Sequence, residues 1–477
     1  MTILKNNWTP ELSFGDIPKY QTIANAIRND IGNGILKVGE RMPTHRNLAW
    51  DLKVTVGTVS RAYAEAERLG LIGGEVGRGT YVRDLSRTQL AQGNRAIMPD
   101  ILMPEEAVET GAINLSFNFP PPAGAVHAMR NTLAELSQDV NLSTFMDYQP
   151  HAGMDRHKEA ASLWLKKRHL NISPGNVMIT PGAHNAALCA LIAITNPGDT
   201  ILVERLTFPG SKAIARMLNL RLVAVDIDAE GLCPDNLRKI CLQERPKALY
   251  CVPTLQNPTN AVMSAGRIQA IAKVADEFGL YVIEDDLFAL LLEKPPTPLC
   301  SLLPDLGFYV TSVSKTLSPG SRTGYITGPI AKRNEVIAAI RATCWMAPPL
   351  STEITSRWIF SGIADEILKQ TRQEARVRRD LFLKIFKDEK AIIPEGALHA
   401  WLQLPQEWDS QSFASALLPK EVILSPSHAF AMPGDTAPNS IRICLGAPKQ
   451  TERLKQALEI IAETLRSGPA IDSMTLV

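Results

Sequence analysis

The sequence lacks both closely spaced cysteine pairs and long hydrophobic runs. Its seven cysteines are scattered and none forms a C-x-x-C pair, which argues against a metal site and against a disulfide framework. The densest apolar run, at 186–195, is too short to cross a bilayer, and residues 1–16 contain no apolar core of signal-peptide length. We therefore expect a cytoplasmic protein with no metal site and no membrane partner.

Net charge is also nearly absent, because the whole chain carries only +1 at pH 7. The charge is not evenly spread, since residues 16–83 contain ten Lys/Arg against seven Asp/Glu. That local excess does not by itself establish nucleic-acid binding, because clustering of basic side chains on one face matters more than their sum. A hydrophobic share of 45% over 477 residues is typical of a folded protein with two or more domains.

Hydrophobic periodicity divides the chain into three parts. Residues 17–83 have the period of short helices, and residues 84–112 form a polar stretch that we interpret as a linker. From 113 to 470, short β-branched runs alternate with helical patterns, which is typical of an α/β domain. We expect it to contain a large subdomain over about 150–345 and an α+β subdomain over about 346–470. The predicted strands lie at 177–180, 201–204, 248–252, 280–284, 308–312, 400–404 and 440–445.

The first part predicts three short helices followed by a β-hairpin, which together make a winged helix-turn-helix. The second helix opens at Thr44, whose hydroxyl can cap free backbone amides, and the third begins at Thr55. A turn containing Arg78 and Gly79 separates the two short strands. One apolar stripe lies along the first helix and consists of Tyr20, Ile23, Ala24, Ile27 and Ile31. Such stripes are typical of any small helical core, so the stripe alone does not indicate DNA binding.

The outward face of the third helix carries small or hydrogen-bonding residues. They are Thr55, Gly57, Thr58, Ser60 and Arg61. Small residues let the start of a helix approach DNA closely, and the polar side chains can donate to phosphates or base edges. For each arginine in this part of the chain, a solvated surface charge is the alternative interpretation.

Residues 20–82 resemble the GntR family of bacterial regulators. The matching segments are GILKVGERMPT at 34–44, RNLA at 46–49, VTVGTVSRAY at 54–63 and GRGTYV at 77–82. The resemblance implies that Arg46 and Thr58 contact phosphates of double-stranded operator DNA, and that Arg78 reaches the minor groove. The start of the third helix would enter the major groove. Val56 stands where relatives often have a base-reading arginine, so base readout would depend more on Thr55, Ser60 and Arg61.

Lys315 is the residue on which the interpretation of the second part depends. It directly follows a predicted buried strand, in the segment TSVSKTLSPGSR at 311–322. A lone lysine is usually a surface charge, but this one is flanked by hydroxyl groups and followed by an arginine. Such a lysine can form an imine with an aldehyde cofactor, while Ser312, Ser314 and Arg322 hold the cofactor's phosphate. The pattern therefore indicates pyridoxal 5'-phosphate.

The other groups that this cofactor needs also follow predicted strands. Asp285 can keep the pyridine nitrogen protonated, Asn257 can donate to the ring oxygen, and Phe208 can cover the ring face. The backbone amides of Gly182, Ala183 and His184 begin an apolar helix and can bind the phosphate. Taken singly, Asp285 could cap a strand end, Asn257 could form a turn and Phe208 could belong to the core. Their shared position after strands favours one site.

Residues 113–465 resemble fold-type I aminotransferases, and specifically the aminotransferase-like half of the MocR subgroup of GntR regulators. The motifs are those already quoted, together with YQPHAG at 148–153, EGALH at 395–399 and SIRIC at 440–444. The resemblance implies a homodimer in which Tyr148 reaches the phosphate bound by the partner subunit, and it implies that Arg442 grips a substrate carboxylate. Relatives carry a tyrosine two or three positions after Asp285, where this chain has Leu287 and Phe288.

These observations leave three functions open. The first is a regulator that senses pyridoxal phosphate, or the aldimine that it forms with an amine or amino acid. The second is an active aminotransferase, which Lys315 and Arg442 favour and the missing tyrosine disfavours, so enzymatic activity stays undecided. The third is a DNA-binding protein whose large domain only dimerises. The fusion favours the regulator, because an enzyme has no need of a helix-turn-helix.

Overall fold

The structure, a computed structural model, describes residues 8–10, 19–32, 35–37, 39–68, 71–75, 79–82 and 111–469. The chain divides into two compact units, with the boundary between Ile101 and Leu102, and each unit is described here by itself. The predicted linker at 84–112 and the predicted DNA contact Arg78 lie outside the described residues, apart from 111 and 112.

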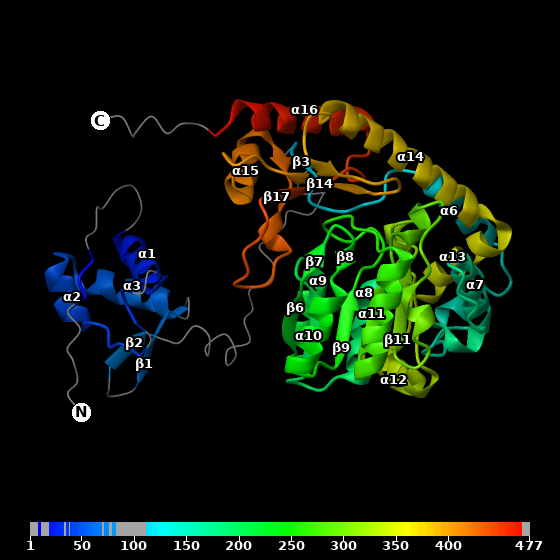
Figure 1. Ribbon diagram of the computed structural model, residues 1–477, viewed down its shortest axis with the longest axis horizontal. Helices are drawn as coiled ribbons and strands as arrows, with labels where there is room; N and C mark the ends of the chain where they lie inside the picture. The colour runs from blue at the N-terminus through cyan, green and yellow to red at the C-terminus, as the bar shows by residue number, and fades with distance from the viewer. Residues whose placement is uncertain are drawn as a thin grey trace. The chain divides into compact units, whose positions relative to one another are not determined.

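The first unit is a three-helix domain with a hairpin (Figure 1). Its elements are α1 (Lys19–Gly32), α2 (His45–Asp51), α3 (Val56–Arg68), β1 (Ile72–Glu75) and β2 (Gly79–Val82). Thr44 caps α2, because its hydroxyl accepts a hydrogen bond from the Asn47 amide at 3.3 Å. Helix α3 begins one residue later than expected, since the Thr55 hydroxyl accepts from the Thr58 amide and so precedes the helix as its cap. Ile23, Ile27 and Val59 are fully buried in the core between the helices.

The second unit contains, within residues 111–469, a seven-stranded sheet in the order β4-β12-β11-β10-β9-β5-β6. Its strands are β4 (Met178–Thr180), β5 (Thr200–Glu204), β6 (Arg221–Val225), β9 (Ala248–Cys251), β10 (Tyr281–Asp285), β11 (Gly307–Ser312) and β12 (Gly324–Thr327). Strand β12 is antiparallel to both of its neighbours, and the other neighbouring pairs are parallel. The order of β4, β12 and β11 was not evident from the sequence.

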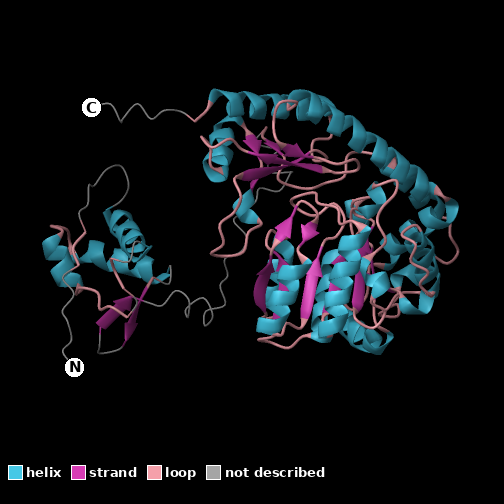
Figure 2. Cartoon of the chain, in the orientation of Figure 1, coloured by secondary structure: helices cyan, strands magenta, loops and turns pink. Residues whose placement is uncertain are grey.

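Helices cover both faces of this sheet (Figure 2). Successive residues of one strand belong to different cores, as Ile201 and Val203 pack on one side and Leu202 on the other. The helices from 125 to 343 are α6 (Ala125–Leu136), α7 (Asp155–Lys166), α8 (Ala183–Ile194), α9 (Pro209–Met217), α10 (Pro234–Glu244), α11 (Ala265–Phe278) and α12 (Arg333–Thr343). A short hairpin, β7 (Ile227–Asp228) and β8 (Gly231–Leu232), comes between β6 and α10 in the chain.

The C-terminal part of the unit is a smaller α+β layer. Its four-stranded antiparallel sheet has the order β13-β14-β17-β16, and β3 pairs separately with β15 in parallel. The strands are β3 (Ile113–Asn114), β13 (Ala391–Ile392), β14 (His399–Gln403), β15 (Val422–Ile423), β16 (Ser425–Pro426) and β17 (Ser440–Cys444). Its helices are α14 (Ile363–Ile385), α15 (Ser410–Leu417) and α16 (Thr451–Ser467), whereas α13 (Pro349–Ser361) packs against α7 of the larger part.

Two features differ from the sequence-based expectation. The last predicted strand, at 440–445, is followed by a helix that was not predicted, α16, whose inner side buries Leu454, Leu458 and Ile461. Strand β3 was not predicted, and it pairs with β15 in the smaller layer. Among the helices that the structure describes, none is both long enough and apolar enough to cross a membrane.

Candidate cofactor and ligand site

The predicted site residues follow the carboxyl ends of parallel strands. The ends in question are Thr180 of β4, Glu204 of β5, Cys251 of β9, Asp285 of β10 and Ser312 of β11. Strands β4 and β11 are both antiparallel to β12, with Thr180 and Ser312 opposite Gly324, so all five ends lie at the same edge. This is the edge where ligands bind in open α/β sheets.

Lys315 lies at this edge, in the turn that follows β11. It is half-buried, its Nζ donates to the backbone carbonyl of Asn118, and it lies 5.9 Å from the centre of the Phe288 ring. Burial lowers the pKa of the Lys315 amine to about 8, and the guanidinium groups of Arg442 and Arg322 act in the same direction. A much larger fraction of this amine is therefore neutral at physiological pH than in an ordinary lysine, and only the neutral amine is a nucleophile.

Asp285 presents a buried carboxylate oxygen without a partner. Its Oδ2 accepts a hydrogen bond from the Tyr250 hydroxyl, whereas Oδ1 has no hydrogen-bond partner in the described part of the chain. Burial raises the pKa of Asp285 to about 7, although the Tyr250 hydrogen bond opposes the shift. An unpaired buried acceptor costs free energy unless a ligand supplies a donor. A protonated pyridine nitrogen would be such a donor, so the site fits the ring of pyridoxal phosphate.

A cradle for an anion lies where β4 turns into α8. Gly182 has φ +95°, and a Cβ placed on it would lie 2.6 Å from Nη2 of Arg322. The absence of a side chain at Gly182 lets the Arg322 guanidinium approach the start of α8, where its Nη2 donates to the Pro181 carbonyl at 3.0 Å. Helix N-termini and arginine both bind phosphate. Ser312, at the end of β11, and Ser314, two residues later, are both buried.

Arg442, on β17, donates hydrogen bonds to three polar groups and still has, among the described residues, one unpaired donor, its Nε. Its Nη1 donates to Oδ1 of Asn257 at 2.7 Å, and its Nη2 donates to the Ser116 carbonyl and the Ser425 hydroxyl. The side chain is 7% exposed, and its Nε has no partner within the residues described. The guanidinium also lies over the Phe430 ring, at 4.6 Å. The unpaired Nε is a suitable donor for a carboxylate.

Of the remaining predicted cofactor residues, Phe208 lies at the same edge of the sheet and Tyr148 does not. Phe208 directly precedes α9, and its ring meets the edge of the His184 ring at 6.3 Å between centroids. Burial lowers the pKa of His184 below its ordinary value. Tyr148 is 83% exposed and lies beside Trp345, so within this single chain it does not contribute to the site.

Three polar residues of the site were not predicted from the sequence. Tyr250 is in the middle of β9 and bonds Asp285, while Asn118 and His399 come from segments far apart in the chain and bond each other at 2.9 Å. Nε2 of His399 donates to the Pro258 carbonyl, so its Nδ1 must be the acceptor for the Asn118 amide. Burial lowers the pKa of His399 to about 3, so the ring is neutral.

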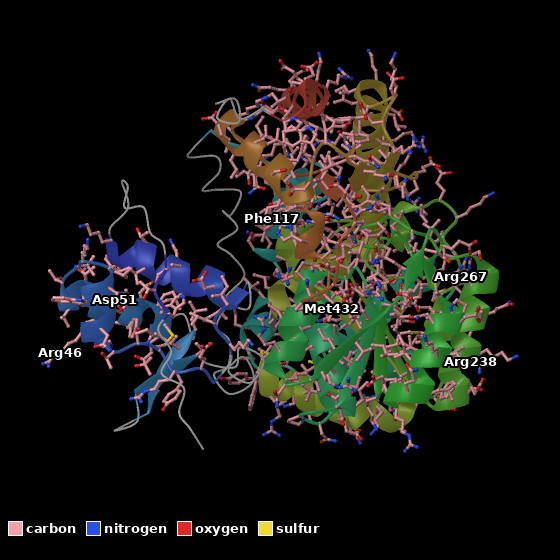
Figure 3. All side chains as sticks on the ribbon, turned by 60° about the vertical axis from the view of Figure 1, so that its left-hand side comes forward. Arg46, Asp51, Phe117, Arg238, Arg267 and Met432 are labelled. Carbon is pink, nitrogen blue, oxygen red and sulfur yellow. The ribbon has the colours of Figure 1, made fainter. Side chains whose placement is uncertain are left out.

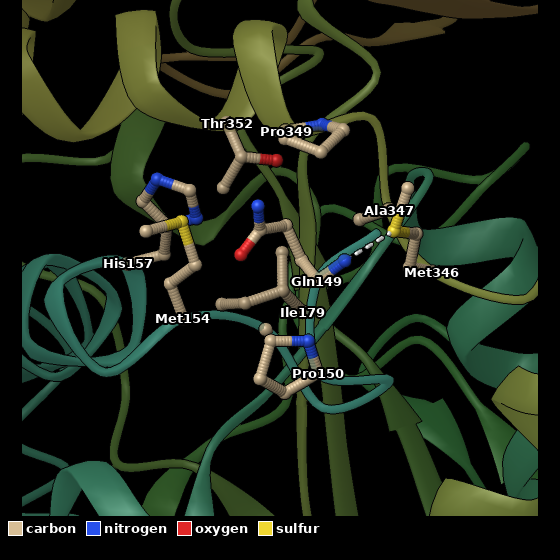
Figure 4. Close-up of a pocket in the computed structure, with 10 residues that line it drawn as sticks. Gln149, Pro150, Met154, His157, Ile179, Met346, Ala347, Pro349 and Thr352 are labelled. Carbon is tan, nitrogen blue, oxygen red and sulfur yellow. Dashed lines mark hydrogen bonds between the residues drawn. The ribbon is translucent and has the colours of Figure 1, made fainter. Parts of the chain in front are cut away.

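A separate small pocket lies between α7, β4 and α13 (Figure 4). Met154, Ile179 and Met346 line it together with His157. The backbone amide of Gln149 donates to Sδ of Met346 at 3.1 Å. His157 itself is bonded to the buried carboxylate of Glu353. None of the residues predicted to bind the cofactor lines this pocket, and we assign it no ligand.

In the first unit, the predicted DNA contacts within the described residues lie on α2, α3 and β2 or directly precede these two helices. Arg46 is exposed and extends outward from α2 (Figure 3), and Gly57 is exposed in the first turn of α3. The Ser60 hydroxyl lies 3.3 Å from Nδ1 of His45, and the Arg61 guanidinium lies 4.5 Å from the centre of the Tyr20 ring. The other candidates are the two cap residues Thr44 and Thr55, Thr58, whose hydroxyl bonds that of Thr55 at 2.8 Å, and Gly79 at the start of β2.

Comparison with known proteins decides the family of the second unit. Residues 110–461, well over half of the chain, match the model of aminotransferase class I and II. The chain belongs to that family. Its cofactor is accordingly pyridoxal phosphate, and the second unit is a fold-type I aminotransferase domain. Residues 19–82 match the model of bacterial regulatory proteins of the gntR family, so the domain order is MocR-like.

Individual relatives match this chain over nearly their whole length. The chain is 27% identical to the uncharacterized HTH-type transcriptional regulator YdeF of Bacillus subtilis, covering 96% of this chain and 97% of that protein. It is 24% identical to the uncharacterized HTH-type transcriptional regulator YjiR of Escherichia coli, covering 94% and 98%. A crystal structure of Pyrococcus horikoshii kynurenine aminotransferase superposes with a TM-score of 0.70 at 24% identity, covering 76% and 93%. This aminotransferase domain therefore belongs to a regulator with a GntR-type DNA-binding domain.

Proposed function

We propose that the protein is a transcription regulator whose affinity for operator DNA depends on pyridoxal phosphate bound covalently at Lys315. The DNA-binding domain spans 17–83, the linker 84–112 and the sensing domain 113–470. An amine or amino acid effector would be recognised at the same site, with its carboxylate on Arg442. A homodimer would pair two DNA-binding domains, and such pairs suit repeated or palindromic operators.

The observation that carries this proposal is the presence of buried polar atoms without hydrogen-bond partners, within the described structure, at this site, in a chain that also has a helix-turn-helix. Asp285 Oδ1 and Arg442 Nε are buried polar atoms without partners among the residues described, and they belong to the two groups expected to bind the cofactor ring and the carboxylate. The Lys315 amine, with its pKa lowered to about 8, is available for bond formation. When bound, the cofactor supplies an aldehyde that can join Lys315 or an effector amine.

Operator affinity measured with and without the cofactor tests the proposal. A duplex chosen by selection from random sequences would be titrated with the full chain, in the absence of ligand, with pyridoxal phosphate, and with pyridoxal phosphate plus single amino acids. A ligand shifts a conformational equilibrium only if it binds the two states differently, so we expect at least one condition to change the affinity. Identical affinities under all conditions would refute regulation by this site. Lys315→Ala is the matched control and should abolish every ligand effect.

An aminotransferase reaction is the second candidate, and the lowered pKa of Lys315 together with the free Nε of Arg442 favours it. Against it, the buried Phe288 near Lys315 has no hydroxyl to hold the ring oxygen, so Asn257 would have to do this alone. Steady-state transamination assays with varied amino donors and 2-oxo acids distinguish the two. Robust turnover without any ligand effect on DNA binding would favour the enzyme.

A further inference from the structure

Residues 113–119, called the strap, lie near the start of the described part of the second unit, which begins at residue 111. The strap begins as β3 and is held in the smaller layer by backbone hydrogen bonds. The Leu115 backbone amide donates to the Ile423 carbonyl at 2.7 Å, and the Cys444 backbone amide donates to the Leu115 carbonyl at 2.9 Å. The strap therefore belongs structurally to the layer that carries Arg442.

Two backbone carbonyls of the strap bind the two cationic side chains of the site. The Ser116 carbonyl accepts from Nη2 of Arg442, and the Asn118 carbonyl accepts from Nζ of Lys315. Hydrogen bonds from charged donors are stronger than neutral ones, and of these two donors Arg442 is buried and Lys315 half-buried. The strap thus occupies donors that the proposed function assigns to the effector carboxylate and to the cofactor aldehyde.

Side-chain contacts fix the position of the second carbonyl. The Asn118 amide donates to Nδ1 of the neutral His399, whose other nitrogen is bonded to Pro258. Gly446 approaches the Phe119 carbonyl so closely that no side chain could be accommodated there. The strap is consequently held in one place on both sides of Asn118. Phe117, between the two carbonyls, is marked in Figure 3.

We propose that the strap is the element through which the site acts on the DNA-binding unit, an inference that rests on the proposed function. When the neutral Lys315 amine condenses with an aldehyde, two N–H bonds are lost, a C=N bond forms and the aldehyde oxygen leaves as water. Both hydrogens of the amine leave in that water, so the unprotonated imine nitrogen has no N–H to donate to the Asn118 carbonyl. A carboxylate that binds Arg442 through both Nε and the neighbouring Nη2 competes with the Ser116 carbonyl for Nη2. Loading of the site therefore releases the strap at two points, close to where the chain continues toward the DNA-binding unit.

Hydrogen–deuterium exchange of the full chain tests this inference directly. Peptides covering the strap would be compared without ligand, with pyridoxal phosphate, and with pyridoxamine phosphate, which has the ring and phosphate but no aldehyde. We expect pyridoxal phosphate to raise exchange in the strap by roughly two- to tenfold, the change that corresponds to loss of one hydrogen bond. Pyridoxamine phosphate should leave the strap unchanged, because Lys315 keeps its free amine.

Two variants of Lys315 provide matched controls. Lys315→Ala removes the donor, so the strap should exchange rapidly without ligand and respond no further to pyridoxal phosphate. Lys315→Arg retains a donor but cannot condense with the aldehyde, so exchange should stay low with or without ligand. Borohydride reduction followed by peptide mass analysis of the wild type verifies that the cofactor is bonded to Lys315.

The outcomes separate this inference from the proposed function. Cofactor trapped on Lys315 with unchanged exchange in the strap would overturn the inference and leave the proposed function standing. Raised exchange with unchanged operator affinity would show that the strap is released without acting on the DNA-binding unit, and would refute both the inference and the proposed function. Absence of any label on Lys315 would overturn both.

Discussion

The lowered pKa of Lys315 makes the rate of cofactor loading a quantitative test of the site. The perturbation is pH, and the structure gives a pKa of about 8 against an ordinary value of 10.5. A lowered pKa means that the amine loses its proton at lower pH. At about pH 7.5 roughly one quarter of the Lys315 amine is then neutral, against roughly one thousandth of an ordinary lysine. We therefore expect loading about 200-fold faster than for an unperturbed amine of equal accessibility.

The assay follows the visible absorbance that appears when pyridoxal phosphate bonds to the lysine, in excess cofactor and at a series of pH values. The rate should rise with pH and reach half its maximum near pH 8. Arg442→Leu removes one positive charge that lowers the Lys315 pKa, so its midpoint should move to higher pH. Arg46→Ala, in the other unit, should keep the wild-type midpoint. A midpoint near 10.5, or the same midpoint in Arg442→Leu, would refute the electrostatic reasoning.

Three further predictions address the ring partner, the phosphate cradle and the DNA contact. The pKa of Asp285 is raised to about 7, so its contribution to stability is present below about pH 4 and lost as the pH rises through about 7. At about pH 8, Asp285→Asn should therefore raise the free energy of unfolding of the cofactor-free protein by a few kcal/mol in urea titrations, while weakening cofactor binding; lower stability would contradict this. Gly182→Ala combines a strained φ of +95° with a clash against Arg322, and should weaken pyridoxal phosphate binding on the order of tenfold or more, with unchanged affinity as the contrary result. Arg46→Ala should weaken binding to all duplexes alike in anisotropy titrations and reduce the salt dependence by about one phosphate contact, whereas loss of affinity for one sequence alone would indicate base readout instead.

The sequence was informative where the physical signal is local. All seven predicted strands correspond to strands in the structure, with ends that differ by one residue, because continuous β-branched runs mark buried strands well. Helix α16 was missed although its pattern is also local, since Leu454, Leu458, Ile461 and Leu465 recur at helical spacing. The sequence therefore contains the signal for this helix, and the helix could have been predicted from it.

The contacts that complete the site could not be obtained in this way. Asn118 and His399 are 281 residues apart, and the Tyr250 hydroxyl reaches Asp285 from a neighbouring strand whose position depends on the sheet order. The same limit applies in the first unit, where Arg61 lies over Tyr20 of a different helix. The DNA contacts and the remaining site residues stay predictions until variants are measured.

The parallel pairing of β3 with β15 has a consequence for biosynthesis. Ile113 pairs with Val422, which the ribosome adds more than 300 residues later. At about 5–20 residues per second, this partner is missing for roughly 15 to 60 s after β3 has been made. During that interval the helix-turn-helix has already been synthesised, and the nascent chain can meet DNA before the aminotransferase domain is complete.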